Sequence, residues 1–321
     1  MLINGLLLSE IKKIKNNISS NIINTPLLRN TDFFSKKLNT NLFLKLEFLQ
    51  HGGSFKLRGA LNNIFHLNKE EKKRGVIAVS AGNHAIAVSI ASKLFNINCK
   101  VIMLKSSNIF RIQKAKLYKS EVLIANDPAE AFQLIQSLSK KEGRIIIHPF
   151  EGLRTIQGSA TLGYEIIEEI DDIDNIIISV GGGGLISGVG SIIRQKFPNC
   201  KIIGVEPEGA CGLTQSLEKG KPLSNVKCNT IADSLSPPFH LPESFSICQN
   251  IINQMVLVSD LQMRIALKFM AQKYKLILEP AAVATIAALQ GPLKNKLQNQ
   301  KTIIILCGTN IDMNTWSNYY K

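Results

Sequence analysis

The sequence lacks the features that mark secreted, zinc-binding and membrane-spanning proteins. Its six cysteines form no C-x-x-C pair, and none stands at zinc-like spacing from the five histidines. No apolar run reaches membrane-spanning length, and the apolar residues 6–8 are followed at once by Ser9, Glu10 and lysines, unlike a signal peptide. A chain of 321 residues also needs no disulfides to stabilise its core. We therefore expect reduced cysteines, a cytoplasmic location and no membrane partner.

Acidic residues are scarce relative to basic ones. The chain has 38 Lys and Arg against 24 Asp and Glu, a net charge of +14. Such a balance is compatible with nucleic acid, an anionic membrane or an acidic substrate. The lysines are scattered, however, and are not interleaved with the few aromatic residues. Because Asn and Ile are abundant too, compositional drift explains the charge better, and we expect no nucleic-acid partner.

Segments of strand-like pattern alternate with segments of helical pattern along most of the chain. Strands are predicted at residues 42–48, 75–79, 99–104, 121–125, 144–147, 176–180, 201–206 and 302–307. Helices are predicted at 9–17, 60–67, 85–95, 109–118, 128–140, 158–170, 185–197, 261–273 and 281–290, with Ser9 capping the first. Residues 225–242, which include Pro237-Pro238, are predicted to be a loop. This alternation indicates a parallel sheet and an α/β fold class.

A single lysine stands between a glycine turn and a helix in the string HGGSFKLRGA, residues 51–60. Gly52 and Gly53 allow a tight turn, and Ser54 is a favourable helix N-cap. Lys56 then falls in the first helical turn, where the helix dipole lowers the pKa of its ammonium group. Such a lysine can act as a nucleophile or carry a Schiff base. Taken alone, the string also fits a capped helix with a solvated lysine.

Four consecutive glycines, Gly181, Gly182, Gly183 and Gly184, lie between the strand 176–180 and the helix 185–197. Bare backbone N–H groups at such a helix N-terminus can bind a phosphate. A tight turn without a ligand is the alternative, although glycine is costly there without a reason. Two more strings, Ser-Ala-Gly-Asn-His at 80–84 and Leu-Cys-Gly-Thr-Asn at 306–310, also follow strand-like runs.

These four strings, in this order, resemble the fold type II pyridoxal-phosphate (PLP) enzymes, and above all the threonine/serine dehydratase and serine racemase family. Further matching strings are Thr25-Pro26-Leu27-Leu28, Ile203-Gly204-Val205-Glu206-Pro207, Thr230-Ile231-Ala232-Asp233 and Leu278-Glu279-Pro280-Ala281. The resemblance implies two parallel-sheet, three-layer domains with the active site in the cleft between them. Residues 1–73 and 149–321 would form a discontinuous PLP-binding domain, and 74–148 a small inserted α/β domain. It also implies a homodimer.

The resemblance assigns roles to individual residues. Lys56 would hold the cofactor covalently and act as the catalytic base, with Phe55 beside the ring. Asn83 would bind the ring hydroxyl, and Cys307 would face the pyridine nitrogen. The implied cofactor residues are Lys56, Phe55, Asn83, Gly181, Gly182, Gly183, Gly184, Cys307 and Glu279. The backbone of Ser80, Ala81, Gly82, Asn83 and His84 would bind the substrate carboxylate, while the His84 side chain is predicted to be structural.

The implied reaction is that of an ammonia-lyase (EC 4.3.1 type), in which α,β-elimination of water from L-threonine or L-serine, followed by hydrolysis of the released enamine, gives a 2-oxo acid and ammonia. A neutral Cys307 near the ring nitrogen makes the cofactor a weaker electron sink, which favours β-elimination over transamination. A serine or aspartate racemase on the same scaffold is the alternative. Racemases of this family carry a serine where this chain has Ala81, which has no proton to give, so the sequence favours the lyase.

Two departures from the family pattern leave the substrate open. Ile86-Ala87 and Gly158-Ser159-Ala160-Thr161 replace the usual Gln-Gly and Gly-Gln-Gly-Thr, so 3-hydroxyaspartate stays a candidate substrate. Arg154 could meet its second carboxylate, although we expect this arginine to face solvent.

For a divalent cation, Glu206 and the Ala210 carbonyl match the family's ligands, but Gly212 replaces the usual aspartate, and we expect no complete site. An alternative of another class is a basic, non-catalytic binding protein. The intact Lys56 and Asn83 argue against it.

Overall fold

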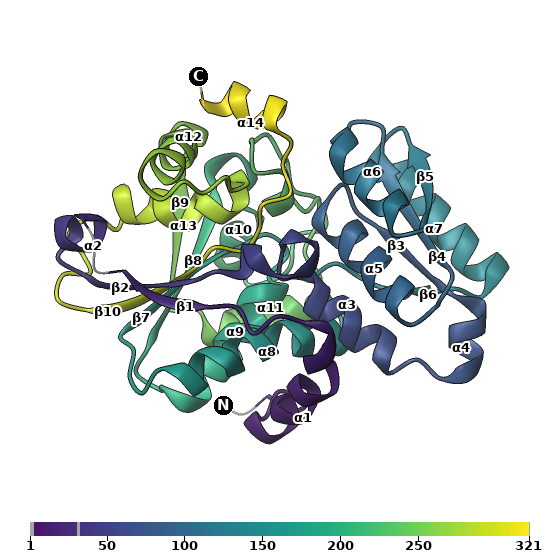
Figure 1. The fold of residues 1–321 in the computed structure, drawn as a ribbon, viewed down its shortest axis with the longest axis horizontal. Helices are drawn as coiled ribbons and strands as arrows, with labels where there is room; N and C mark the ends of the chain where they lie inside the picture. The colour runs from purple at the N-terminus through teal and green to yellow at the C-terminus, as the bar shows by residue number, and fades with distance from the viewer. Residues whose placement is uncertain (1–2, 31–32, 321) are drawn as a thin grey trace.

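The larger of two β-sheets lies at the centre of the computed structural model, which describes residues 3–30 and 33–320 (Figure 1). Its strand order is β1-β2-β10-β7-β8-β9. The strands are β1 Leu27–Asn30, β2 Asn41–Lys45, β10 Lys301–Ile305, β7 Asn175–Ser179, β8 Lys201–Pro207 and β9 Gln254–Val258. Only the edge pair β1–β2 is antiparallel among the pairings in this sheet of the described chain. All five residues of β7 are buried, as expected for a strand covered on both faces.

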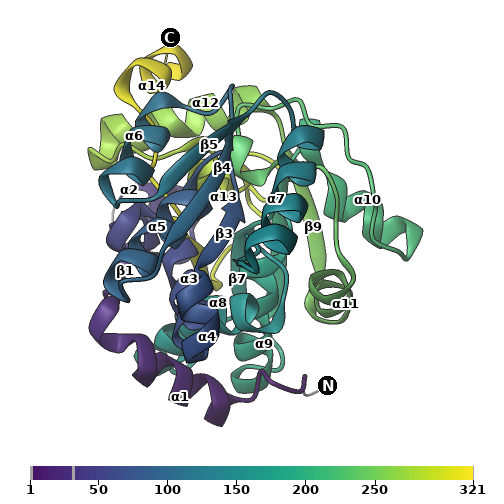
Figure 2. The ribbon, with the colours of Figure 1, turned by 90° about the vertical axis from the view of Figure 1, so that its right-hand side faces the viewer.

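The smaller sheet has the strand order β5-β4-β3-β6, and its pairings are parallel. Its strands are β5 Glu121–Ala125, β4 Cys99–Leu104, β3 Val76–Val79 and β6 Ile145–Ile146. The sheet supplies residues to two apolar clusters. Val76 and Val101 belong to the cluster with α5 (Asn83–Leu94), and Ile77 and Ile102 to that with α7 (Pro128–Glu142). Alternate side chains thus cover opposite faces, and Figure 2 shows α7 over the outer one. The predicted α/β class is confirmed.

Helices cover both faces of the larger sheet. One layer contains α8 (Leu153–Glu169) and α9 (Gly184–Lys196), with α1 (Leu8–Ile18) and α3 (Lys56–Phe65) packed on α8. The other contains α13 (Pro280–Gln290), which packs along β7–β10, and α12 (Asp260–Phe269). The remaining helices are α2 Phe33–Leu38, α4 Lys69–Arg74, α6 Ile109–Leu117, α10 Gly212–Lys219, α11 Pro242–Ile251 and α14 Met313–Tyr320. None of the described helices combines the length and apolar character that a membrane span requires.

Several predicted boundaries are wrong for identifiable reasons. The strand predicted at 42–48 ends at Lys45 because the chain turns at Leu46 and continues as a 3₁₀ turn. Ser9 lies inside α1, whose first turn is capped instead by the Glu10 carboxylate, which accepts from Leu7 N–H at 2.9 Å. Ser54 is not an N-cap: it is extended and pairs with Gly308, and Phe55 precedes α3.

Other helices and strands were predicted with wrong bounds or were not predicted. The helix predicted at 158–170 begins five residues earlier, at Leu153. The helix predicted at 261–273 is α12 followed by a π-turn, Met270–Tyr274. Strand β9 and helices α10 and α11 were not predicted.

Candidate active site

A cavity of about 520 Å³ opens beyond the carboxyl ends of strands from both sheets. Val79, Leu104 and Ile146 line it from the ends of β3, β4 and β6, and Gly182 from the loop after β7. Residues of α7 and of the segment 226–239 complete the walls. Ligands of parallel α/β proteins bind at this edge of the sheet. The cavity also contains Lys56, so it is the candidate active site.

Lys56 is the first residue of α3, and its amine lies in this cavity. Nζ donates to the Pro149 carbonyl at 2.5 Å and lies 4.8 Å from the centre of the Phe55 ring. Burial is the largest cause and lowers the pKa of Lys56 to about 8, although the neighbouring Cys307 and Glu279 groups act in the opposite direction. The pKa of Lys56 is therefore lowered, as predicted, but the largest cause is removal of the amine from water and not the helix dipole. A lysine with this pKa is readily available as a neutral amine.

The turn before Lys56 requires its two glycines. Gly52 and Gly53 have φ of +80° and +78°, a region that side chains disfavour. A Cβ on Gly53 would also lie 2.9 Å from Oδ1 of Asn310. The Gly53 carbonyl accepts from Thr309 N–H at 3.0 Å, so this turn is fastened to the loop after β10.

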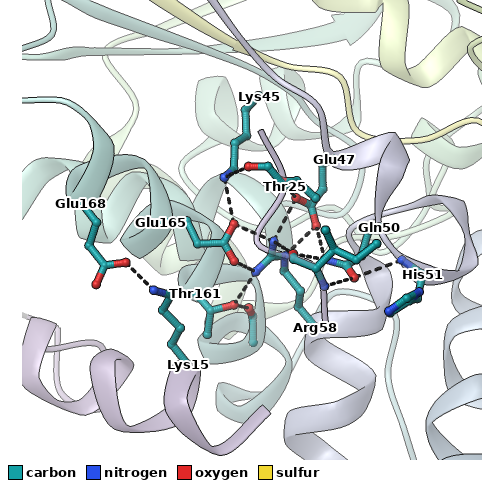
Figure 3. Close-up of polar contacts among 12 residues, drawn as sticks. Lys15, Thr25, Lys45, Glu47, Gln50, His51, Arg58, Thr161, Glu165 and Glu168 are labelled. Atoms are coloured by element: carbon teal, nitrogen blue, oxygen red, sulfur yellow. Dashed lines mark hydrogen bonds and ion pairs between the residues drawn. The ribbon is translucent and has the colours of Figure 1, made fainter. Parts of the chain in front are cut away.

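A buried ionic cluster connects α3 to neighbouring elements (Figure 3). Arg58 donates from Nε to Glu47 and from Nη1 to Glu165, both at 2.6 Å, and Lys45 Nζ lies 2.8 Å from Glu165. All four side chains are at most 1% exposed. The cluster joins α3 to the end of β2 and to α8, two residues from Lys56. Sequence reasoning missed it, although Lys45 inside a strand pattern was a signal.

Close helix packing supports the same element. A Cβ on Gly158 of α8 would lie only 2.4 Å from the Arg58 carbonyl oxygen and 2.5 Å from Cα of Gly59. Glycine at position 158 therefore lets α3 and α8 approach backbone to backbone.

The glycine loop has no room for side chains. A Cβ on Gly182 would lie 2.2 Å from the Phe150 ring, and one on Gly184 2.7 Å from the Phe150 carbonyl oxygen. Gly183 has φ of +91°, and Gly181 faces the Leu235 backbone. The loop therefore presents backbone N–H groups at the N-terminus of the buried helix α9, where the first amides have no acceptor in a preceding turn. This cradle fits a phosphate.

Asn83 and Glu279 meet beside the cavity. Asn83 Nδ2 donates to Glu279 at 2.7 Å, and its Oδ1 accepts from Asn310 Nδ2 at 2.6 Å. Burial raises the pKa of Glu279 to about 7, although the Arg111 charge opposes this. Asn83 is thus held at the start of α5 by groups 196 and 227 residues away.

Two further predicted residues are uncharged groups. His84 Nε2 donates to the Ile147 carbonyl at 2.8 Å, and burial followed by the Lys56 charge lowers its pKa to about 3. This environment agrees with a structural role for the imidazole. Burial, with the Glu279 charge adding to it, raises the pKa of the Cys307 thiol well above its ordinary value. Cys307 therefore stays a neutral thiol beside Lys56.

The predicted residues divide into those that line the cavity and those behind its wall. Lining residues are Lys56, Ser80, Ala81, Gly82, Asn83, His84 and Gly182. Phe55, Gly181, Gly183, Gly184, Glu279 and Cys307 are not part of the lining. The cavity also contains Arg111 and Asp233, which were not predicted and which form an ion pair. A basic helix at 109–118 was predicted, but nothing in its pattern shows that residue 111 faces the cleft.

The weak metal candidates have other partners. Glu206 accepts from Leu213 N and Thr214 N, both at 2.8 Å, and from Thr214 Oγ1 at 2.6 Å, so it binds the N-terminus of α10. Burial raises the pKa of Glu206 to about 7. Ala210 lies in the short turn before α10. The described residues contain no group of three His, Cys, Asp or Glu side chains suited to a metal ion.

The profile of pyridoxal-phosphate dependent enzymes matches residues 18–308. The chain belongs to this family. It is 38% identical to a phenylserine dehydratase of Ralstonia pickettii, over 97% of this chain and 95% of the relative. It is 34% identical to a catabolic L-threonine dehydratase of Escherichia coli, over 95% and 93%. A serine racemase structure from Dictyostelium discoideum matches with a TM-score of 0.88 and 32% identity, covering 96% of this chain and 100% of that one.

These matches confirm the predicted resemblance to the threonine/serine dehydratase and serine racemase group and its fold type II architecture. The cofactor is pyridoxal phosphate, and the lyase class is confirmed because near-full-length relatives are dehydratases. The chain's own residues fit this cofactor: Gly182 of the phosphate cradle and the buried Lys56, with its lowered pKa, line one cavity, and the neutral Cys307 lies behind its wall.

Proposed function

We propose that this PLP-dependent lyase acts on a β-hydroxy amino acid, L-threonine or L-serine, and releases a 2-oxo acid and ammonia. The observation that carries the proposal is the buried Lys56 amine of lowered pKa in the same cavity as the glycine loop. The names of the similar dehydratases support the choice of substrate class.

Lys56 is proposed as the catalytic residue. When bound, the cofactor withdraws electrons from the substrate α-carbon, so that its proton becomes acidic and the β-hydroxyl can leave. The Lys56 amine then takes the α-proton as general base, which its pKa of about 8 favours near neutral pH. We assign the substrate carboxylate to the backbone N–H groups of residues 80–84, at the N-terminus of α5.

The proposed cofactor contacts keep their predicted assignment. The glycine loop takes the phosphate, Phe55 packs by the ring, and Asn83, Glu279 and Cys307 surround its polar edge. Ala81 lines the cavity and offers no second acid or base, which favours elimination over racemisation. Arg154 is exposed and outside the cavity lining, so the acidic substrate 3-hydroxyaspartate has less support.

The domain division, the oligomeric state and the cellular location belong to the same proposal. We infer that the two sheets form two domains, 1–73 with 149–321 and 74–148, because the strands of each sheet all fall within one of these parts. The helix α3 nevertheless shares an apolar cluster with the small sheet. We also propose a homodimer, on the family resemblance, and a cytoplasmic location, which the free cysteines of the described chain support.

The deciding experiment combines spectroscopy and product analysis. Purified protein supplied with pyridoxal phosphate should show the visible band of a lysine-bound cofactor and should form 2-oxo acid and ammonia in equal amounts from L-threonine or L-serine. Lys56→Ala should lose both, whereas Lys73→Ala, an exposed lysine 73% accessible, should keep both. A protein that shows no band even with excess cofactor would contradict the proposal and leave the non-catalytic binding protein as the better interpretation.

A further inference from the structure

Asn310 lies behind the cavity wall, in the loop that follows β10. It is 1% exposed and is not part of the cavity lining. Its backbone N–H donates to Glu279 Oε2 at 3.1 Å, and its carbonyl accepts from Arg111 Nε at 2.7 Å. The backbone of Asn310 is thus held between the start of α13 and α6. Any effect of Asn310 on a molecule in the cavity has to pass through another residue.

The side-chain amide of Asn310 is held in one of its two possible orientations. Its Oδ1 accepts from Lys114 Nζ at 2.7 Å, and its Nδ2 donates to the Gly52 carbonyl at 2.7 Å. A lysine ammonium only donates hydrogen bonds, and a carbonyl oxygen only accepts them. Exchanging Oδ1 and Nδ2 would therefore break both hydrogen bonds. The orientation of this amide is set by α6 on one side and by the turn before Lys56 on the other.

The orientation of Asn310 determines that of Asn83. The Nδ2 of Asn310 also donates to Asn83 Oδ1 at 2.6 Å, so Asn83 turns its own Nδ2 to Glu279, at 2.7 Å. Glu279 alone could not fix the Asn83 amide, because burial raises the pKa of this carboxyl to about 7 and a protonated carboxyl can donate as well as accept. An amide nitrogen only donates, so Asn310 decides the orientation of Asn83.

Asn83, held in this way, has one N–H group left for a ligand. An amide nitrogen carries two N–H groups. One of them binds Glu279, and the other has only a long contact, 3.4 Å, with Ser234 Oγ. Asn83 and Ser234 both line the cavity. The second N–H of Asn83 is therefore available to an oxygen atom of a molecule bound there.

We propose that Asn310 is a positioning residue, which orients the Asn83 amide so that it offers an N–H group to the ring oxygen of pyridoxal phosphate. This inference rests on the proposed lyase function and on its assignment of Asn83 to the cofactor ring. With the amide reversed, Asn83 would present Oδ1 to this oxygen and could not donate to it, so the hydrogen bond would be lost.

The test compares two cofactors that differ only at the ring oxygen. Dissociation constants of pyridoxal phosphate and of 3-deoxypyridoxal phosphate, which lacks the ring hydroxyl, are measured on the full-length protein by equilibrium dialysis. Asn310→Asp keeps the shape of asparagine but removes the donor, so Asn83 should turn its Nδ2 toward residue 310. We expect this variant to weaken the binding of pyridoxal phosphate by roughly tenfold, the effect of one hydrogen bond, and that of the deoxy analogue much less. Asn310→Ala, which removes the donor without burying a carboxylate, should shift the ratio in the same direction and replaces the first variant if that one does not fold.

A double-mutant cycle tests whether Asn310 acts through Asn83. Both dissociation constants are measured for Asn83→Ala, for Asn310→Asp and for the two substitutions together. Without the Asn83 amide, Asn310→Asp should no longer change the ratio of the two constants. Asn17→Asp, the same change at an exposed asparagine of α1, is the matched control and should leave the ratio unchanged.

The outcomes separate this inference from the function on which it rests. If Asn310→Asp left both dissociation constants unchanged, raised both equally, or shifted their ratio as much without the Asn83 amide as with it, the positioning role would be wrong. Release of 2-oxo acid from L-threonine or L-serine is measured on the same wild-type preparation, and its presence would leave the lyase function standing in each of these cases. If the ratio shifted as expected but no 2-oxo acid formed, the lyase function would fail and the positioning role of Asn310 would stand.

Discussion

At the scale of single residues, the environment of Lys56 makes a prediction about how the cofactor enters. Only the neutral amine attacks an aldehyde, and burial lowers the pKa of this amine to about 8 in the cofactor-free protein. Compared with a pKa of 10.5, this raises the neutral fraction at neutral pH by roughly 300-fold. The rate of reconstitution with pyridoxal phosphate should therefore rise with pH and level off above about 8. Stopped-flow absorbance measures this rate, and a rate still rising steeply above pH 9 would contradict the assigned pKa.

Ala81 gives a second prediction at the residue scale. It lines the cavity next to Gly82 and Asn83 but has no proton to transfer. The wild-type protein should therefore form 2-oxo acid from L-serine with little D-serine, whereas Ala81→Ser should raise the proportion of D-serine. Chiral chromatography of the reaction mixture measures both products. Ala81→Gly is the control, since it alters the backbone without adding a hydroxyl. Equal D-serine from both variants would show that residue 81 does not supply the second acid.

At the scale of elements, much of the fold could be predicted, because alternation and apolar runs report burial directly. Strands β4 and β5 were predicted with their observed bounds. The chain between residues 207 and 258 was predicted poorly. The loop predicted at 225–242 on Pro237-Pro238 is confirmed up to residue 241, with one 3₁₀ turn, but α11 begins at Pro242, a first helical position that proline tolerates well. Strand β9 is partly exposed at the edge of its sheet and carries a weaker apolar signal.

The buried cluster beneath α3 makes a prediction at the same scale. Arg58→Met would leave Glu47 and Glu165 buried without the guanidinium that binds both. Loss of one partner from a buried ion pair costs about 3–5 kcal/mol of unfolding free energy. Urea unfolding measures this loss. The visible absorbance of cofactor bound to the variant should also be lower than in the wild-type protein, because α3 carries Lys56.

The surface pair Lys15–Glu168 provides the matched comparison. Both side chains contact solvent, so Lys15→Ala should cost less than about 1 kcal/mol. If both variants lost the same free energy of unfolding, Arg58 would contribute no more to stability than a surface ion pair does.

At the scale of the whole molecule, the site depends on contacts that no local pattern reveals. Asn83 binds Glu279 and Asn310, and Arg111 binds Asp233, across separations of 122 to 227 residues. The strings that carry these residues could be recognised in the sequence, and their meeting at one cavity follows from the parallel sheets. Arg111 could not be predicted, because the orientation of α6 across the cleft depends on tertiary packing. The cavity walls formed by α7 and the segment 226–239 were missed for the same reason, because the two segments are far apart in sequence.

The net charge of +14 makes the last prediction, about stability as a function of salt. Like charges in excess repel one another in the compact state, and salt screens this repulsion over about 10 Å at 0.1 M. Buried pairs such as Arg58–Glu165 are screened much less, so added NaCl should raise the melting temperature, by about 2–4 °C for each 1 kcal/mol gained. Differential scanning calorimetry from low salt to physiological ionic strength measures the shift. The same titration near the sequence pI of about 9.5 is the control, because the net charge there is close to zero and the shift should vanish. A melting temperature that falls with salt at neutral pH would mean that exposed pairs such as Lys301–Asp172 stabilise the fold more than the excess positive charge destabilises it.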